Sequence, residues 1–289
     1  MKVYVTNPHG YCMGVIQAIK IALQVKKANP DRQVAILGML VHNEEVIKML
    51  ESYHIETLLP EVDDYANVME RIDPSKIVIF TAHGHDERLD AIALRRGIEI
   101  HDATCRMVKE NSEQITQALK AGHQVIYIGK HHHPETVAAL SLGKEVYLYD
   151  QQYPFNFLDI TDPSPLVINQ TTLSMLEIND IHQTILHKIP FAHIADEICD
   201  ATRRRQTAVY NIPLETELIY IVGSPKSSNT AKLTSIALSS HPKAKVIQIK
   251  TVDDIAHRDL ENIQFASVAS GASTPMEITD AVIDYLKNY

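Results

Sequence analysis

Residues 98–120, IEIHDATC followed by RMVKENSEQITQALK, contain a strand-like stretch, then Cys105, and then a stretch with helical periodicity. Two further segments repeat this order. They are KVYVTNPHGYC with MGVIQAIKIALQVKK (2–27) and AHIADEIC with DATRRRQTAVY (192–210). Cys12, Cys105 and Cys199 are 93 and 94 residues apart, and 90 residues follow the last of them. A pattern that recurs at near-equal intervals predicts three structural units of similar size.

Apolar runs typical of buried strands alternate with helix-period segments along the rest of the chain. The strand-like runs are QVAILG (33–38), KIVIF (76–80), QVIYIG (124–129), KEVYLY (144–149), PLVIN (165–169), ELIYIVG (217–223), KVIQIK (245–250) and FASVAS (265–270). This alternation predicts an α/β fold with parallel sheets. We expect three small α/β domains in a pseudo-threefold arrangement around a central cleft. The expected domains are residues 13–104, 105–198 and 199–289, the last joined by the N-terminal strand in residues 1–12.

The composition limits the class of partner. The 289 residues include 27 Lys plus Arg against 36 Asp plus Glu, so the formal net charge is −9. A broad surface for nucleic acid is therefore not expected. No apolar run approaches the roughly 18 to 20 residues that a membrane span needs, and the N-terminus leads straight into a strand-like stretch. We expect a cytoplasmic protein that binds neither nucleic acid nor a membrane.

Three cysteines do not make a disulfide framework in a cytoplasmic protein. A cysteine at a helix N-terminus has its thiolate stabilised by backbone N–H groups, as a metal-binding sulfur requires. Zinc with a histidine as fourth ligand is one interpretation, although the close CxxC or HxxxH pair usual in zinc motifs is missing among these cysteines. A four-iron four-sulfur cluster is the other, and three cysteines would leave one iron open to a substrate hydroxyl.

Polar residues follow the predicted strands, where ligands bind in open α/β sheets. In chain order these residues are His42, His83, His133 with Glu135, Thr171, Ser227 with Ser228 and Asn229, and Ser273. The segment GSPKSSN before a predicted helix is typical of an anion site, because hydroxyl, amide and free N–H groups there suit phosphate oxygens. Neither a GxxxxGK[ST] nor a GxGxxG motif is present, so the sequence favours a phosphorylated ligand smaller than a nucleotide.

Nine motifs in order resemble one enzyme family over nearly the whole chain, the 4-hydroxy-3-methylbut-2-enyl diphosphate reductases. They are GYCMGV, LVHN, TAHG, DATC, HPE, QTTLS, ICDAT with RRRQ, GSPKSSN and SGASTP. The resemblance implies an oxidoreductase of the methylerythritol phosphate route of isoprenoid biosynthesis, with three α/β domains in a trefoil around a four-iron four-sulfur cluster. The implied reaction is a reductive dehydroxylation by two electrons and two protons that yields isopentenyl and dimethylallyl diphosphate.

The resemblance also implies roles for single residues. Cys12, Cys105 and Cys199 would bind the cluster, and the substrate hydroxyl would take the fourth iron. Glu135 would supply the proton, Thr171 would link it to the substrate hydroxyl, and His133 would assist as a third catalytic residue. The substrate would be bound by His42, His83, His133, Thr171, Ser227, Ser228, Asn229 and Ser273, with Thr171 at its hydroxyl group and the others around its diphosphate.

Arg203, Arg204 and Arg205 begin four residues after Cys199 and suggest where an electron donor could dock. A solvated helix face is the ordinary explanation of such a run. The alternative is a docking surface for an acidic ferredoxin or flavodoxin. Two other functions also stay open: a zinc-dependent hydrolase of a small phosphorylated substrate that uses Glu135 as base, and an iron-sulfur sensor without enzymatic activity.

Overall fold

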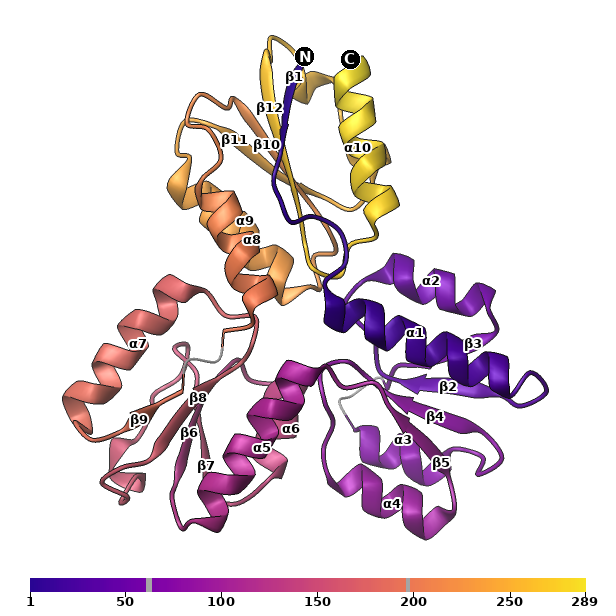
Figure 1. Ribbon diagram of the computed structural model, residues 1–289, viewed down its shortest axis with the longest axis vertical. Helices are drawn as coiled ribbons and strands as arrows, with labels where there is room; N and C mark the ends of the chain where they lie inside the picture. The colour runs from indigo at the N-terminus through magenta and orange to yellow at the C-terminus, as the bar shows by residue number, and fades with distance from the viewer. Residues whose placement is uncertain (61–63, 196–197) are drawn as a thin grey trace. The chain divides into compact units, whose positions relative to one another are not determined.

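The computed structural model describes residues 1–60, 64–195 and 198–289. In these ranges the strands pair in parallel and form three four-stranded sheets, with helices between successive strands (Figure 1). The expected α/β class with parallel sheets is confirmed. By contacts, the chain divides into two compact units: residues 1–16, 42–46 and 199–289, and residues 17–41 and 47–198. Residues 196 and 197, part of the strand-like segment AHIADEIC, lie outside the described residues.

One sheet has the strand order β3-β2-β4-β5. Its strands are β2 (Val34–Leu37), β3 (Ile55–Leu58), β4 (Ile77–Phe80) and β5 (Glu99–Asp102). The neighbouring helices in the chain are α1 (Met13–Ala28), α2 (Glu44–Ser52), α3 (Tyr65–Arg71) and α4 (Arg88–Arg96). Every residue of the central strands β2 and β4 is buried. The sequence analysis did not name β3, because this edge strand is partly exposed and lacks a continuous apolar run.

A second sheet has the order β7-β6-β8-β9. Its strands are β6 (Val125–Ile128), β7 (Val146–Tyr149), β8 (Leu166–Asn169) and β9 (His193–Ile194). The helices around it in the chain are α5 (Arg106–Lys120), α6 (Pro134–Ser141), the 3-10 helix η1 (Phe157–Asp159) and α7 (Met175–Lys188). The central strands β6 and β8 are again buried along their whole length.

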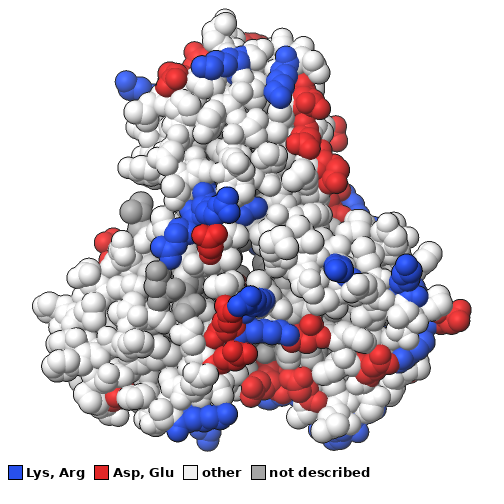
Figure 2. Space-filling model, in the orientation of Figure 1, with Lys and Arg blue, Asp and Glu red and all other residues white. Residues whose placement is uncertain are grey.

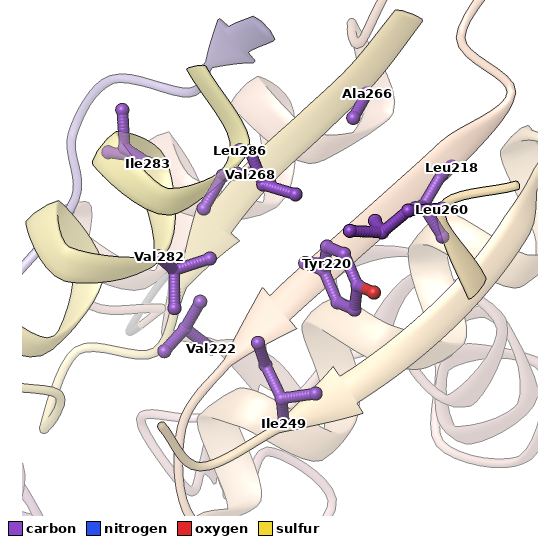
Figure 3. Close-up of a cluster of buried hydrophobic side chains, with 10 residues drawn as sticks. All are labelled: Leu218, Tyr220, Val222, Ile249, Leu260, Ala266, Val268, Val282, Ile283 and Leu286. Atoms are coloured by element: carbon purple, nitrogen blue, oxygen red, sulfur yellow. The ribbon is translucent and has the colours of Figure 1, made fainter. Parts of the chain in front are cut away.

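The third sheet, β1-β12-β10-β11, joins the two ends of the chain. Its strands are β1 (Lys2–Val5), β10 (Leu218–Val222), β11 (Lys245–Ile249) and β12 (Phe265–Ser270). Its helices are α8 (Asp200–Tyr210), α9 (Ser228–Ser240), the 3-10 helices η2 (Val252–Asp254) and η3 (His257–Asp259), and α10 (Met276–Asn288). Figure 3 shows Val282, Ile283 and Leu286 of α10 beside Val222 and Val268 of the sheet. This packing forms one of the buried cores that hold the strand ends in position.

All three sheets share one topology. If the strands of each are numbered in chain order, and β1 is counted as the fourth strand of the third sheet, the spatial order is second, first, third, fourth in every case. The fourth strands are β5, β9 and β1, and each leads to a cysteine. This shared position after the fourth strand is the structural reason for the near-equal cysteine spacing.

The first and third strands lie side by side in each sheet, and the chain leaves them toward opposite edges. Such a point, where the strand order reverses, is where open α/β sheets bind ligands. Gly129 directly follows the first strand of the second sheet, and Gly223 directly follows that of the third. A Cβ on either glycine would lie 2.6 Å from a threonine hydroxyl of the next helix, Thr136 or Thr230. Glycine at both positions therefore lets the helix start close to the strand end.

Two surface properties bear on the class of partner. None of the helices that the structure describes combines the length and the apolar character that a membrane span requires. On the face that Figure 2 shows, Lys and Arg are intermingled with Asp and Glu. A mixed surface of this kind is not the continuous positive surface that a nucleic-acid backbone attracts.

Candidate active site

The three cysteines occupy the same local position, one residue before a helix. Cys105 and Cys199 are the N-caps of α5 and α8, and α1 begins directly after Cys12. The Cys12 N–H donates to the carbonyl oxygen of Ala272 at 3.0 Å, and the Cys105 N–H donates to that of Ala82 at 2.9 Å. In both cases the acceptor is the second residue after the third strand of its sheet. The expected order of strand, cysteine and helix is therefore present three times.

Cys12 and Cys199 belong to the first compact unit, and Cys105 belongs to the second. In the described residues, no group of three or more His, Cys, Asp or Glu side chains forms a metal-binding cluster. The binding of one cluster by these three thiols remains a prediction from the sequence.

Glu135 and Thr171 form a buried pair in the second sheet. Glu135 lies in the first turn of α6, after the first strand, and Thr171 is the second residue after the third strand, β8. The Thr171 N–H donates to Glu135 Oε2 at 2.9 Å, and Thr171 Oγ1 donates to Glu135 Oε1 at 2.9 Å. The exposed fractions are 4% for Glu135 and 6% for Thr171. The structure thus brings together the two residues that the sequence analysis assigned to proton delivery.

Burial changes the acidity of this carboxyl group. It raises the pKa of Glu135 from its ordinary value of 4.5 to about 7, although the two hydrogen bonds from Thr171 act in the opposite direction. A carboxyl group with this pKa is partly protonated at neutral pH, as a general acid must be. The pKa of the neighbouring Tyr127 phenol is raised well above 10, by burial and by Glu135, so Tyr127 stays neutral.

Two histidines lie next to this pair. His133 is the N-cap of α6, and its Nδ1 accepts a hydrogen bond of 3.2 Å from the Glu135 N–H. The rings of His133 and His83 meet edge to face, with 5.9 Å between their centroids. His83 follows β4 of the first sheet, so two sheets contribute histidines to this part of the second unit.

Gln170 is a residue of this site that the sequence analysis missed. Its side chain is fully buried, its Oε1 accepts from the Lys130 N–H at 3.1 Å, and its Nε2 donates to Thr172 Oγ1 at 2.9 Å. These hydrogen bonds link the loop before α6 to the loop that contains Thr171. Its position directly before Thr171, at the end of a buried strand, was the signal in the sequence.

The first compact unit holds a second group of candidates. Ser273 Oγ donates to the carbonyl oxygen of His42 at 3.2 Å. Lys226 Nζ lies 3.6 Å from Glu44 Oε1. Burial and, to a smaller extent, the charge of Lys226 lower the pKa of His42 below its ordinary value of 6.5. A bound diphosphate would act in the opposite direction and would favour the doubly protonated imidazole.

Ser227, Ser228 and Asn229 form the start of α9. Ser227 is the N-cap and accepts from the Thr230 N–H at 3.3 Å. Asn229 is 4% exposed, and its Oδ1 accepts from the Ala272 N–H at 3.0 Å. Its buried Nδ2 has no hydrogen-bond partner among the residues that the structure describes. An amide donor left over at a helix N-terminus, beside a serine hydroxyl, is suited to an anionic oxygen.

The arginine run after Cys199 does not form one solvated face. Arg204 is exposed, Arg203 is half-buried and Arg205 is only 3% exposed. The hypothesis that all three arginines meet an electron donor is therefore wrong for Arg205. Successive helix residues point about 100° apart, so a run of three cannot share one side.

The comparison with known families identifies the chain. The family model described as LytB protein matches residues 3–287. The chain belongs to the LytB family. The family predicted from the nine motifs is thereby confirmed, since curated relatives in it carry the name of the 4-hydroxy-3-methylbut-2-enyl diphosphate reductases.

Two of these LytB relatives are similar to the whole chain. The one from an Exiguobacterium species is 36% identical over 294 residues, covering 100% of this chain and 91% of the relative. The one from Bacillus subtilis is 35% identical over 292 residues, with the same two coverages. Both are named 4-hydroxy-3-methylbut-2-enyl diphosphate reductase.

A solved structure of the family agrees with the fold. The E-1-hydroxy-2-methyl-but-2-enyl-4-diphosphate reductase from Plasmodium falciparum matches with a TM-score of 0.87 and 26% sequence identity. The match covers 99% of this chain and 88% of that one.

Proposed function

We propose that this protein is a reductase that removes the hydroxyl group of 4-hydroxy-3-methylbut-2-enyl diphosphate. Two electrons and two protons are consumed, the C–O bond breaks, the hydroxyl group leaves as water, and isopentenyl or dimethylallyl diphosphate forms. The observation that carries the proposal is the buried Glu135–Thr171 pair in a chain of the LytB family. In this proposal the reaction is the last step of the methylerythritol phosphate route to isoprenoids.

Glu135 acts as the proton donor in this proposal. Its pKa of about 7 leaves a proton on the carboxyl group at neutral pH. Thr171 donates one hydrogen bond from its backbone and one from its hydroxyl, which fixes both carboxyl oxygens. His133 fixes the first turn of α6 through the Glu135 N–H. A fixed carboxyl group needs little reorganisation when it releases its proton.

In this proposal the diphosphate is bound by amide, hydroxyl and imidazole donors. Asn229 Nδ2 and the hydroxyl groups of Ser227 and Ser228 can donate hydrogen bonds without a lysine cluster, and the Ser273 hydroxyl can do so when it turns from the His42 carbonyl oxygen to the ligand. His42 and His83 add donors that become cationic beside a diphosphate, and His133, whose Nδ1 accepts from the Glu135 N–H, can donate from Nε2. Thr171 completes the set near the substrate hydroxyl. Donors of this kind explain how a chain with a net charge of −9 can bind a strongly anionic substrate.

The cofactor in this proposal is a four-iron four-sulfur cluster bound by Cys12, Cys105 and Cys199. The residues fit such a group, because each thiol begins a helix whose N–H groups favour the thiolate, and the buried Arg205 acts electrostatically on Cys12 and Cys199. When bound, the cluster supplies electrons one at a time together with the Lewis acidity of its iron.

The reductase is better supported than the two alternatives. A pKa of about 7 suits Glu135 to act as an acid or as a base, so the acidity of this carboxyl group does not separate a reductase from a hydrolase. A sensor without activity would have no use for the buried Glu135–Thr171 pair or for the donors at the start of α9. The named LytB relatives are reductases over the full length of this chain.

The electron donor and the cytoplasmic location stay predictions from the sequence. A ferredoxin or flavodoxin remains the proposed donor, with Arg203 and Arg204 as the accessible part of the arginine run. Reversing both charges is expected to slow turnover with the protein donor and to leave turnover with a small chemical reductant unchanged. Equal effects on both would exclude this docking site.

One experiment tests the proposed function directly. The protein is purified anaerobically, its iron and acid-labile sulfide are counted, and it is assayed with 4-hydroxy-3-methylbut-2-enyl diphosphate and a chemical reductant. We expect about four iron and four sulfide per chain and release of the two five-carbon diphosphates. A colourless zinc protein that releases phosphate would support the hydrolase, and a cluster protein without turnover would support the sensor.

A further inference from the structure

Arg205 differs from its two arginine neighbours in its surroundings. It lies on the buried side of α8 together with Thr202 and Gln206, and these three residues are 2 to 4% exposed. Lysine and arginine are almost never fully buried unless a counterion or a ligand compensates the charge. Arg205 therefore needs a physical explanation that Arg204, exposed on the same helix, does not.

Two nitrogens of Arg205 donate to backbone carbonyl oxygens, one near Cys12 and one near Cys199. Nη2 donates to the carbonyl oxygen of Gly10 at 2.7 Å, and Nη1 donates to that of Ala201 at 3.1 Å. The Gly10 N–H in turn donates to Ser270 Oγ at 2.9 Å. The guanidinium group thus links the segment before Cys12 to the first turn of the helix that Cys199 caps.

The third nitrogen of the Arg205 guanidinium, Nε, has different surroundings. Nε is buried and has no hydrogen-bond partner among the described residues. A buried N–H without an acceptor destabilises the folded protein, and more so when the group is charged. Native proteins rarely keep such a group unless something outside the protein chain accepts the bond.

The charge of Arg205 has no carboxylate to balance it within the described residues. The groups that act on it electrostatically are Cys12, Cys199 and Arg204. Burial lowers the pKa of the guanidinium below its ordinary value, and the two thiols act in the opposite direction, Cys12 more than Cys199. Among the described residues, the anionic groups that act on this buried cation are the thiols of Cys12 and Cys199.

We propose that Arg205 is a positioning residue that donates a hydrogen bond from Nε to a sulfur of the iron-sulfur centre held by Cys12 and Cys199, and that its charge makes this centre easier to reduce. The inference rests on the proposed function. Hydrogen bonds to sulfur and the local net charge are the terms that set the potentials of such centres. Arginine suits this position because its planar, weakly hydrated group can bond two carbonyls and still offer Nε.

The test compares Arg205→Gln and Arg205→Lys with a matched control, Arg204→Gln, one residue away on the exposed side of α8. Each protein is reconstituted anaerobically with iron and sulfide, and the midpoint potential is measured by a mediator titration followed by electron paramagnetic resonance. We expect Arg205→Gln to shift the equilibrium about tenfold toward the oxidised centre, which is about 59 mV for a one-electron couple. Arg205→Lys, which keeps the charge but loses Nε, should shift it about threefold. Arg204→Gln should shift it by less than either.

A purely structural role predicts a different pattern. If Arg205 only fastens Gly10 to α8, the substitutions lower the melting temperature or the iron content, and the loaded fraction keeps the potential of the unmodified protein. An unchanged potential in Arg205→Gln overturns the inference. If that variant does not fold, Arg205→Lys decides in the same way.

A second measurement detects the hydrogen bond itself. In protein labelled with ¹⁵N-arginine, pulsed electron paramagnetic resonance of the reduced centre should show a ¹⁵N coupling that persists in Arg204→Gln and is absent in Arg205→Lys. Absence of the coupling in the unmodified protein overturns the inference. If that protein still holds an iron-sulfur centre and reduces the substrate, the proposed function stands. If the unmodified protein takes up no iron and sulfide, the proposed function fails and this inference fails with it.

Discussion

The starts of α6 and α9 have the same position in their sheets and different chemistry. Each helix follows the first strand of its sheet, with His133 or Ser227 as N-cap, and Glu135 and Asn229 are each two residues after that cap. Each of these two side chains accepts a hydrogen bond from the backbone N–H of the second residue after the third strand. The acceptor–donor pairs are Glu135 with Thr171 at 2.9 Å and Asn229 with Ala272 at 3.0 Å.

This difference shows how one repeated topology can supply two functions. The shared hydrogen bond fastens the helix start to the third strand and needs only an oxygen acceptor. What remains on the side chain differs: Glu135 keeps a carboxyl proton because of its raised pKa, and Asn229 keeps an amide donor without a partner in the described residues. One position is therefore suited to deliver a proton, and the other to bind an anion.

The largest effect is expected from Glu135→Gln. The amide oxygen can still accept from the Thr171 N–H, but the side chain has no acidic proton, so the two compared positions become chemically alike. We expect turnover to fall by about 10²- to 10⁴-fold, the usual contribution of a general acid, with little change in substrate affinity. Steady-state kinetics with a chemical reductant measures turnover, and calorimetric titration measures substrate affinity. Turnover like that of the control Glu113→Gln, on the exposed side of α5, would exclude Glu135 as proton donor.

The same substitution should change how stability depends on pH. The folded-state pKa of Glu135 is raised from 4.5 to about 7, so its contribution to stability is complete below pH 4.5 and is lost as the pH rises through 7. Glu135→Gln removes this loss. Between pH 4.5 and 8 we expect the free energy of unfolding of the variant to rise by up to about 3 kcal/mol relative to that of the unmodified protein. Thermal unfolding across this range checks the sign, and a constant difference would mean that Glu135 is ionised throughout.

Asn229→Asp places a carboxylate at the position compared with Glu135. The Asp oxygen can still accept from the Ala272 N–H, but the amide donor is replaced by a negative charge. We expect diphosphate binding to weaken by about tenfold to a hundredfold, or about 1.4 to 2.8 kcal/mol. Calorimetry with inorganic diphosphate and with substrate tests this, with Asn179→Asp on the exposed side of α7 as the matched control. Equal affinity in both variants would remove Asn229 from the anion site.

The smallest effect concerns Thr171. Its hydroxyl donates to Glu135 and lowers the pKa of the carboxyl group, so Thr171→Val should raise that pKa further. The loss of activity at high pH should then move upward by less than about one pH unit, the size of a single hydrogen bond. Thr171→Ser keeps the hydroxyl and should leave the pH profile in place. A shift to lower pH in Thr171→Val would contradict the assigned direction of the hydrogen bond.

Local sequence patterns were sufficient for much of this protein. The continuous apolar runs of β4, β6, β8 and β10 predicted buried strands, because a strand buried on both faces is apolar at every position. Patterns of this kind failed where burial depends on distant residues. The edge strand β3 has no such run, and the buried positions of Gln170 and Arg205 result from loops and helices that pack against them.

The amino-acid sequence alone determined the class of fold, the three cysteines before helices, and the polar residues that follow the strands, since each depends on residues close together in the chain. Only the tertiary structure decided that Glu135 is buried against Thr171, that the Asn229 amide has no acceptor among the described residues, and that Arg205 is buried where two thiols act on it electrostatically. These properties depend on neighbours that are 36 to 195 residues away in the chain. Burial and electrostatic environment are sums over such neighbours, and a local pattern does not contain them.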